Sequence, residues 1–146
     1  MTHTTFDGYQ AWVGGNYGLN WYDSTTTNTS LGLTLKNIRW EQQGGTTGYF
    51  VYIRHNYRLQ QLILENLYGA GDTNGFYFDK VDKISMKEVF YIGNQTGLAT
   101  SSTCNYITFD NVFFNDPATT MSINSEYGLS GTYYVGGAAY TYLPKP

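Results

Sequence analysis

One stretch, ITFDNVFF at residues 107–114, decides the fold, because its pattern occurs three more times in the chain. The other copies are LTLKNIRW at residues 33–40, LILENLYG at residues 62–69 and ISMKEVFY at residues 84–91. Their first residues lie about 29, 22 and 23 positions apart, the period of a solenoid in which one repeat is one turn of the stack. The sequence therefore predicts a repetitive fold.

The first, third and sixth positions of the pattern are apolar in all four copies. The second position is mostly small and hydroxylic, so the first half of each copy alternates apolar and polar residues, as a half-buried strand does. A helix would need apolar residues three and four positions apart, and these short pieces do not offer them. Each copy is therefore expected to contribute β-strand, with its apolar positions facing inward.

The fifth position of the pattern predicts a corner between two strands. It holds asparagine in three copies and glutamate in one, at Asn37, Asn66, Glu88 and Asn111. Asparagine tolerates left-handed backbone and hydrogen-bonds its own neighbours, which suits a sharp turn. Stacked about 4.8 Å apart, these residues would form a ladder of amides, with Glu88 replacing one rung. The fourth position alternates in charge, which would put opposite charges on neighbouring rungs: Lys36, Glu65, Lys87 and Asp110.

This unit of strand, asparagine corner and strand resembles the right-handed parallel β-helix of pectate-lyase-like proteins and of phage tailspikes and capsule depolymerases. The resemblance covers roughly residues 32–116, and the asparagine ladder is its most specific part. The chain departs from the pattern at Glu88 and in the long first interval, where a loop is expected near residues 43–48. The resemblance implies an all-β fold: a short right-handed parallel β-helix of about four to five coils with terminal caps, assembled as a homotrimer.

The flanking segments differ in amino-acid composition from the repeats. Residues 1–31 are interpreted as an N-terminal cap or an imperfect first coil, and residues 32–116 as the coils. Residues 117–146 are rich in tyrosine and glycine and are expected to cap the last coil or to contact other copies of the chain. A strand pair is predicted there around Gly136 and Gly137.

Composition limits the partners that we expect. With 146 residues the chain is expected to form one domain, and its net charge of −3 comes without a basic cluster, so nucleic acid is not an expected partner. No run approaches the roughly 20 apolar residues of a membrane span, and no signal peptide opens the chain. The single cysteine, Cys104, is expected to be a buried thiol. No metal or cofactor motif is present, so none is expected.

Sugar binding needs aromatic faces and planar hydrogen-bonding groups, and a β-helix offers rows of both. The candidates are Trp40, Tyr52, Tyr57, Arg58, Tyr77 and Tyr91. An equally weighted alternative for each is a place in the core or in a subunit interface. His55 is interpreted as a polar loop or binding residue.

An enzyme with this fold would be expected to cut polysaccharide, and hydrolysis would need a pair of carboxylates. The candidates are Asp79, Asp82 and Asp110, in a wider set of outward-facing acids that adds Glu41, Asp72, Asp116 and Glu126. The favoured interpretation is that these are solvated loop and ladder charges. Lyase chemistry would use Arg54, Arg58, Lys80 or Lys83, but no acidic cluster with calcium-loop spacing accompanies them.

The leading functional prediction is a structural module of the virion surface, of the tail-fibre, tailspike or decoration kind, which recognises host surface glycan. It would be extracellular and would not insert into membranes. The alternative is a polysaccharide-degrading lyase or glycoside hydrolase, as a fragment of a capsule depolymerase. A bacterial adhesin segment is a third possibility and lacks the expected secretion signals.

Overall fold

A computed structural model describes residues 3–8, 10–12, 17–24, 26–27, 29–41, 48–71, 74–93, 95–101, 103–124 and 128–142. These residues form fourteen strands and no helix. The expectation of an all-β fold with parallel strands is confirmed, because the strands form two largely parallel sheets that face each other. The loop was predicted near residues 43–48, and its residues 43–47 lie outside the described residues, as do the acids Asp72 and Glu126.

The larger sheet, sheet A, contains the repeats. Its strand order is β1-β5-β7-β9-β11-β13-β14, and β2 also pairs with β5. All of these pairings are parallel except that of β13 with β14. The strands are β1 (His3–Asp7), β2 (Gln10–Trp12), β5 (Gly32–Glu41), β7 (Leu62–Ala70), β9 (Ile84–Ile92), β11 (Ile107–Phe114), β13 (Ser130–Val135) and β14 (Ala138–Tyr142).

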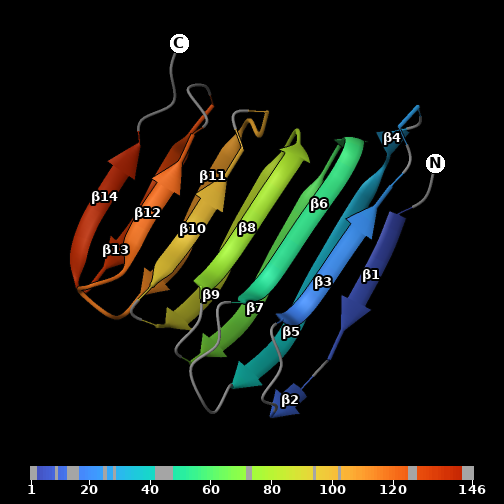
Figure 1. The fold of residues 1–146 in the computed structure, drawn as a ribbon. Coiled ribbons are helices and arrows are strands. Elements are labelled where there is room, and N and C mark those ends of the chain that lie inside the picture. The colour runs from blue at the N-terminus through green and yellow to red at the C-terminus, as the bar shows by residue number, and fades with distance from the viewer. Residues whose placement is uncertain are drawn as a thin grey trace.

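The smaller sheet, sheet B, is formed by the segments between the repeats. Its order is β12-β10-β8-β6-β3, with β4 also paired to β6, and every pairing is parallel. The strands are β3 (Tyr17–Asp23), β4 (Thr29–Ser30), β6 (Tyr49–Leu59), β8 (Asn74–Val81), β10 (Thr96–Thr100) and β12 (Thr120–Ile123). The chain thus passes from one sheet to the other in each coil, and the coils follow one another along the stack (Figure 1).

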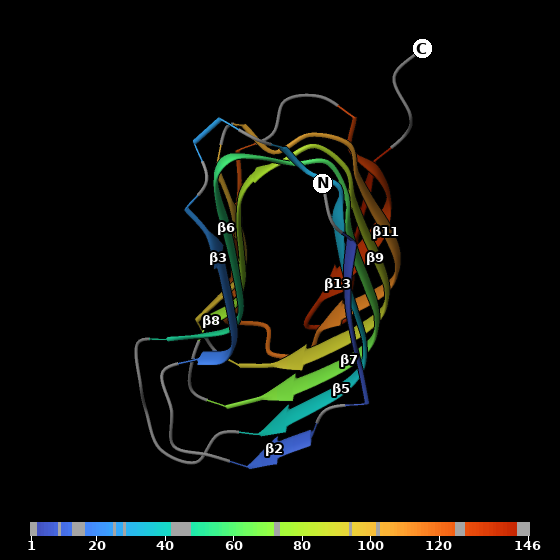
Figure 2. The same ribbon diagram turned by 90° about the vertical axis from the view of Figure 1, so that its right-hand side faces the viewer.

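Each long strand of sheet A bends at the fifth position of the repeat. The φ angles there are 55° at Asn37, 52° at Asn66, 52° at Glu88 and 53° at Asn111. Figure 2 shows these strands running down one side of the coil and turning onto a second side. Asn66 Nδ2 donates to Asn37 Oδ1 at 2.8 Å, and Asn37 Nδ2 donates to Asp7 Oδ1 at 2.8 Å.

The core lies between the two sheets and is entirely apolar along the repeat. Side chains at the first, third and sixth positions of all four copies are at most 3% exposed. Large rings from sheet B fill the remaining space: Phe50 stacks on Trp40 with centroids 5.4 Å apart. Gly69 makes room for this ring, since a Cβ atom there would lie 2.5 Å from Phe50 Cδ1. Cys104 is buried as predicted, and its Sγ donates to Phe78 O at 3.3 Å.

The described part of residues 3–31 forms a coil of its own. Strand β1 pairs with β5 from His3 opposite Gly32 to Asp7 opposite Lys36. Gly8 comes next with a φ of 78°, so it occupies the corner position that Asn37 occupies after Lys36. The charge alternation therefore continues one rung further, and Asp7 Oδ2 lies 3.8 Å from Lys36 Nζ. The sequence pattern missed this copy because glycine replaces the corner asparagine.

The C-terminal end of sheet A is a hairpin. Strands β13 and β14 pair antiparallel across Gly136 and Gly137, which have φ of 55° and 87°. Two left-handed residues are what a tight hairpin turn requires, and glycine adopts them without strain. The predicted strand pair at this position is confirmed. Within the described residues, no helix is long and apolar enough to cross a membrane.

The corner residue is expected to be a measurable source of stability. The Asn66→Ala variant should keep the fold. Alanine has a Cβ atom but no side-chain amide to hydrogen-bond locally, so left-handed backbone at this position costs about 1–2 kcal/mol. Chemical denaturation of Asn66→Ala should show this loss. Asn66→Gly is the control, because glycine accepts the backbone and removes only the amide. Equal losses in the two variants would contradict a backbone origin for the effect.

Candidate functional site

The outer face of sheet B brings together two of the predicted sugar-binding tyrosines. Tyr52 on β6 and Tyr77 on β8 are opposite each other in register, and both point away from the core because they alternate with buried neighbours. Their row continues across the sheet as Asn20, Tyr52, Tyr77, Ala99 and Ser122. The row thus changes from large rings to small side chains after Tyr77.

The two tyrosine rings form a stacked pair. Their centroids lie 4.7 Å apart with planes 14° from parallel, and the Tyr49 ring is tilted against both at 5.5 and 5.8 Å. One face of Tyr77 is therefore covered by Tyr52, whereas the next residue on its other side is only Ala99. Burial raises the pKa of Tyr77, as do Asp79 and Tyr52, so its hydroxyl keeps its proton and can donate.

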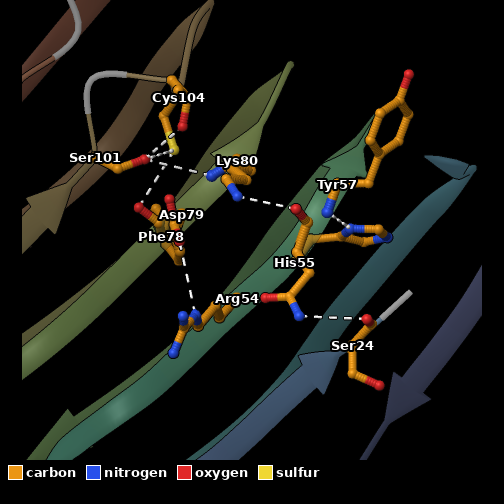
Figure 3. Close-up of polar contacts among 11 residues, drawn as sticks. Ser24, Arg54, His55, Tyr57, Phe78, Asp79, Lys80, Ser101 and Cys104 are labelled. Atoms are coloured by element: carbon orange, nitrogen blue, oxygen red, sulfur yellow. Dashed lines mark hydrogen bonds and ion pairs between the residues drawn. The ribbon is translucent and has the colours of Figure 1, made fainter. Parts of the chain in front are cut away.

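Arg54 lies beside these tyrosines, two residues further along β6. Its register neighbours are Tyr22 on β3 and Asp79 on β8. The guanidinium carbon lies 5.3 Å from the centroid of the Tyr22 ring, and Nε lies 3.8 Å from Asp79 Oδ2. Figure 3 shows this ion pair bridging the two strands. Because the Arg54 side chain is 49% exposed, its remaining N–H groups can reach a ligand.

Tyr57 and Arg58 lie at the far end of β6, away from the stacked pair. Tyr57 is 50% exposed, and Arg58 Nε lies 3.3 Å from Asp82 Oδ1. Asp82 and Lys83 also line a shallow depression with His3, Leu31, Gln60 and Gln61. The predicted sugar-binding residues are thus divided between the outer face of sheet B and the end of β6.

The prediction for Trp40 and Tyr91 is corrected by their burial. Trp40 is 1% exposed and Tyr91 is 0% exposed, so neither can stack on a sugar. Both occupy the eighth position of the repeat. After the corner, the strand alternation resumes with the sixth position inward, so the eighth also faces the core. Tyr91 packs there against Phe76 and Phe114 at 6.3 and 6.4 Å.

The seventh position of the repeat, which the sequence reasoning passed over, forms a second outward row. We call it the sheet A aromatic row; its members are Arg39, Tyr68, Phe90, Phe113 and Tyr134. The Arg39 guanidinium lies 4.7 Å from the Tyr68 centroid, and the four rings follow one another down the stack. The signal was present in the sequence, because three of the four repeat copies have an aromatic residue at this position.

The candidate acids are distributed over both sheets. Asp79 and Asp82 each lie near an arginine, as described above, whereas Asp110 is exposed on sheet A opposite Lys87. Of the wider set, Glu41 accepts from Arg39 Nε at 3.0 Å, and Asp116 accepts from the Ala118 amide at 2.8 Å. No group of three or more His, Cys, Asp or Glu residues in the described ranges could hold a metal ion.

His55 is buried behind the sheet B face and makes a polar cluster with Asp23 and Ser30. The Tyr57 amide donates to its Nδ1 at 2.8 Å, so the neutral ring carries its proton on Nε2, 3.1 Å from Ser30 Oγ. Ser30 in turn donates to Asp23 Oδ2 at 2.8 Å. With its Nε2 protonated, His55 has no free lone pair facing Ser30 and cannot activate it as a nucleophile. The cluster is therefore a structural hydrogen-bond network.

Comparisons with protein-family models, with curated proteins and with solved structures gave no match to this chain. The assignment of a function therefore depends on the chemistry of the two sheet faces.

The His55 network predicts a loss of stability in weak acid. Burial lowers the pKa of His55, and Lys80 lowers it further, while Asp23 acts in the opposite direction. As pH falls through the unfolded pKa of about 6.5, the unfolded chain therefore gains a proton that the folded chain does not, and stability is lost until the folded pKa is reached. The urea midpoint should fall between pH 8 and pH 5.5.

The matched variant for this experiment is His55→Asn, whose Oδ1 can accept from the Tyr57 amide but does not titrate. Its midpoint should change less over the same pH range. His3→Gln is the control, because His3 is exposed and its Nε2 lies 2.9 Å from Thr34 Oγ1 at the surface. An unchanged pH dependence in His55→Asn would rule out His55 as its source.

Proposed function

We propose that the chain is a structural module of a virion surface, of the tail-fibre, tailspike or decoration kind, and that it recognises host surface polysaccharide. The observation that carries the proposal is the stacked Tyr52–Tyr77 pair beside Arg54 and Asp79 on the outer face of sheet B. The polysaccharide would stack on the free face of Tyr77, above Ala99 and Ser122. The proposed location is extracellular.

The physical basis is the match between this face and a sugar. A sugar ring has an apolar face that packs on an aromatic ring, and hydroxyls at its edge that bond to guanidinium, carboxylate and phenol groups. The tyrosine rings are held by a parallel sheet and by each other, so little side-chain entropy is lost when the ligand binds. The Arg54–Asp79 pair is close to electrically neutral, which favours a neutral sugar at this position.

The proposed assembly is a homotrimer of right-handed β-helices, each with four to five coils and terminal caps. Parallel strands joined by a crossover within one sheet follow a right-handed path in about 98% of cases, which supports the handedness. The adjoining, partly exposed rings of the sheet A aromatic row support association, since contiguous apolar surface of this kind marks contact surfaces.

The alternative function, a polysaccharide lyase or hydrolase, has less support from the described residues. Asp79 and Asp82 both lie close to arginines, and Asp110 belongs to the other sheet. Hydrolysis instead needs two carboxylates that flank the bond that is cut.

The Tyr77→Ala variant tests the proposed binding face. Removing the ring should weaken binding of extracted bacterial surface polysaccharide about 5-fold to 10-fold, since an aromatic contact of this kind contributes about 1 kcal/mol beyond its buried area. Tyr140→Ala, an exposed tyrosine on sheet A, is the matched control and should bind as the wild type does. Equal effects of the two substitutions, measured by isothermal titration calorimetry, would exclude the sheet B face.

Light scattering of the native protein, with and without the polysaccharide, tests assembly and chemistry together. We expect the mass of three chains and a polysaccharide of unchanged mass. A single-chain mass would contradict the trimer, and a falling polysaccharide mass would contradict the binding-only function in favour of the enzyme.

A further inference from the structure

The sheet A aromatic row is closely stacked at two places and open between them. Phe90 stacks on Tyr68 with centroids 5.6 Å apart and planes 5° from parallel, and Phe113 stacks on Tyr134 at 4.8 Å and 11°. Between Phe90 and Phe113 the centroids are 6.3 Å apart and the planes are tilted by 43°. Each phenylalanine thus has one face covered by a parallel neighbour, and their two other faces diverge.

A depression of about 340 Å³ lies where these rings diverge. Phe90 and Phe113 supply its apolar lining, and the corner residues Glu88 and Asn111 supply a carboxylate and an amide. Both corner residues are exposed. Two hydrophobic ring faces with hydrogen-bonding groups at the edge are the composition of a small-molecule site.

Glu88 is the residue that interrupts the asparagine ladder. Its φ of 52° is less favourable for glutamate than for asparagine, and it has no amide with which to donate to the next rung. Among the described residues it takes part in none of the ion pairs within 4.0 Å. Glutamate at this corner therefore carries a cost in stability that no ion pair with the other described residues offsets.

The charges around the depression favour a cation. The register puts Lys87 between Glu65 and Asp110 on the neighbouring rungs, so its charge is offset by theirs. Together with Glu88, three carboxylates surround one ammonium group on this part of sheet A. Aromatic ring faces also attract cations, which adds to the preference for a positive ligand.

We propose that this depression is a second binding site, which takes an amino sugar with a free, protonated amine. The apolar face of the sugar ring packs against Phe90 and Phe113, its ammonium group pairs with the Glu88 carboxylate, and Asn111 bonds a neighbouring hydroxyl. The site lies on the opposite sheet from the Tyr52–Tyr77 pair and selects for charge. It therefore stands independently of the sugar binding proposed for sheet B.

The experiment compares two oligosaccharides with the same sugar backbone. The full chain is titrated at pH 6 with a glucosamine tetramer, which carries free amines, and with an N-acetylglucosamine tetramer, which carries none. We expect the glucosamine tetramer to bind at least about 10-fold more tightly, because a hydrogen bond to a charged group is lost in the acetylated form. Equal binding of both, or binding of neither, would overturn the proposal.

Variants locate the site. Glu88→Gln keeps the size of the side chain and should weaken glucosamine tetramer binding about 10-fold. Glu65→Gln removes the same charge one rung away and should change it less than about 3-fold. An equal loss in both variants would mean general charge attraction and would overturn the site. Measured in a Tyr77→Ala background, the loss caused by Glu88→Gln should have the same size, which separates the site from the sheet B face.

Glu88→Asn provides a readout that does not depend on a ligand. Restoring the amide should raise the melting temperature by about 3–6 °C while weakening glucosamine tetramer binding as Glu88→Gln does. A melting temperature that does not rise would contradict the stability cost on which the proposal rests. If Glu88→Gln instead changed the native mass in light scattering, the occupant would be a second copy of the chain, and the amino-sugar site would be wrong.

Discussion

Every long strand of sheet A passes through one left-handed residue, and the register of the stack depends on it. The backbone at Asn37, Asn66, Glu88 and Asn111 turns sharply without ending the strand pairing, because the residues before and after the corner stay in register with the neighbouring coils. The corner therefore determines which side chains face the core, both in the strand segment before it and in the segment after it. A shift of one residue would turn the apolar first, third and sixth positions outward.

The corner also explains how much of the fold could be predicted from the sequence alone. The apolar columns, the corner and the parallel stacking follow from a pattern that repeats four times, and repetition makes the strand period visible. The first coil was harder to recognise because Gly8 stands at its corner and its columns carry Thr4 and Phe6, so that few positions match the repeat. Sheet B was only partly visible, since its strands vary in length and lie at variable distances from the repeats.

The candidate site was predictable only in part, because the direction of a side chain depends on its distance from the corner. Tyr52 and Tyr77 lie on a regular strand face, and their exposure follows from alternation with Val51, Ile53, Phe76 and Phe78. Trp40 and Tyr91 have the same chemistry but stand at the eighth repeat position, which the alternation turns inward. The ring centroids are 4.7 Å apart in the Tyr52–Tyr77 pair and 6.3 Å apart between Phe90 and Phe113. This difference depends on ring tilt, and no sequence pattern encodes that tilt.

The alternation of charge along sheet A has a consequence for how such a chain can change in length. The signs at Asp7, Lys36, Glu65, Lys87 and Asp110 repeat every two coils, whereas the backbone repeats every coil. Insertion or duplication of a single coil anywhere inside this series would put two like charges next to each other, at a cost in free energy. Insertion of two coils would preserve every pair. By this criterion the stack grows or shrinks by an even number of coils, unless a substitution at the fourth repeat position first removes the repulsion that a single added coil would create.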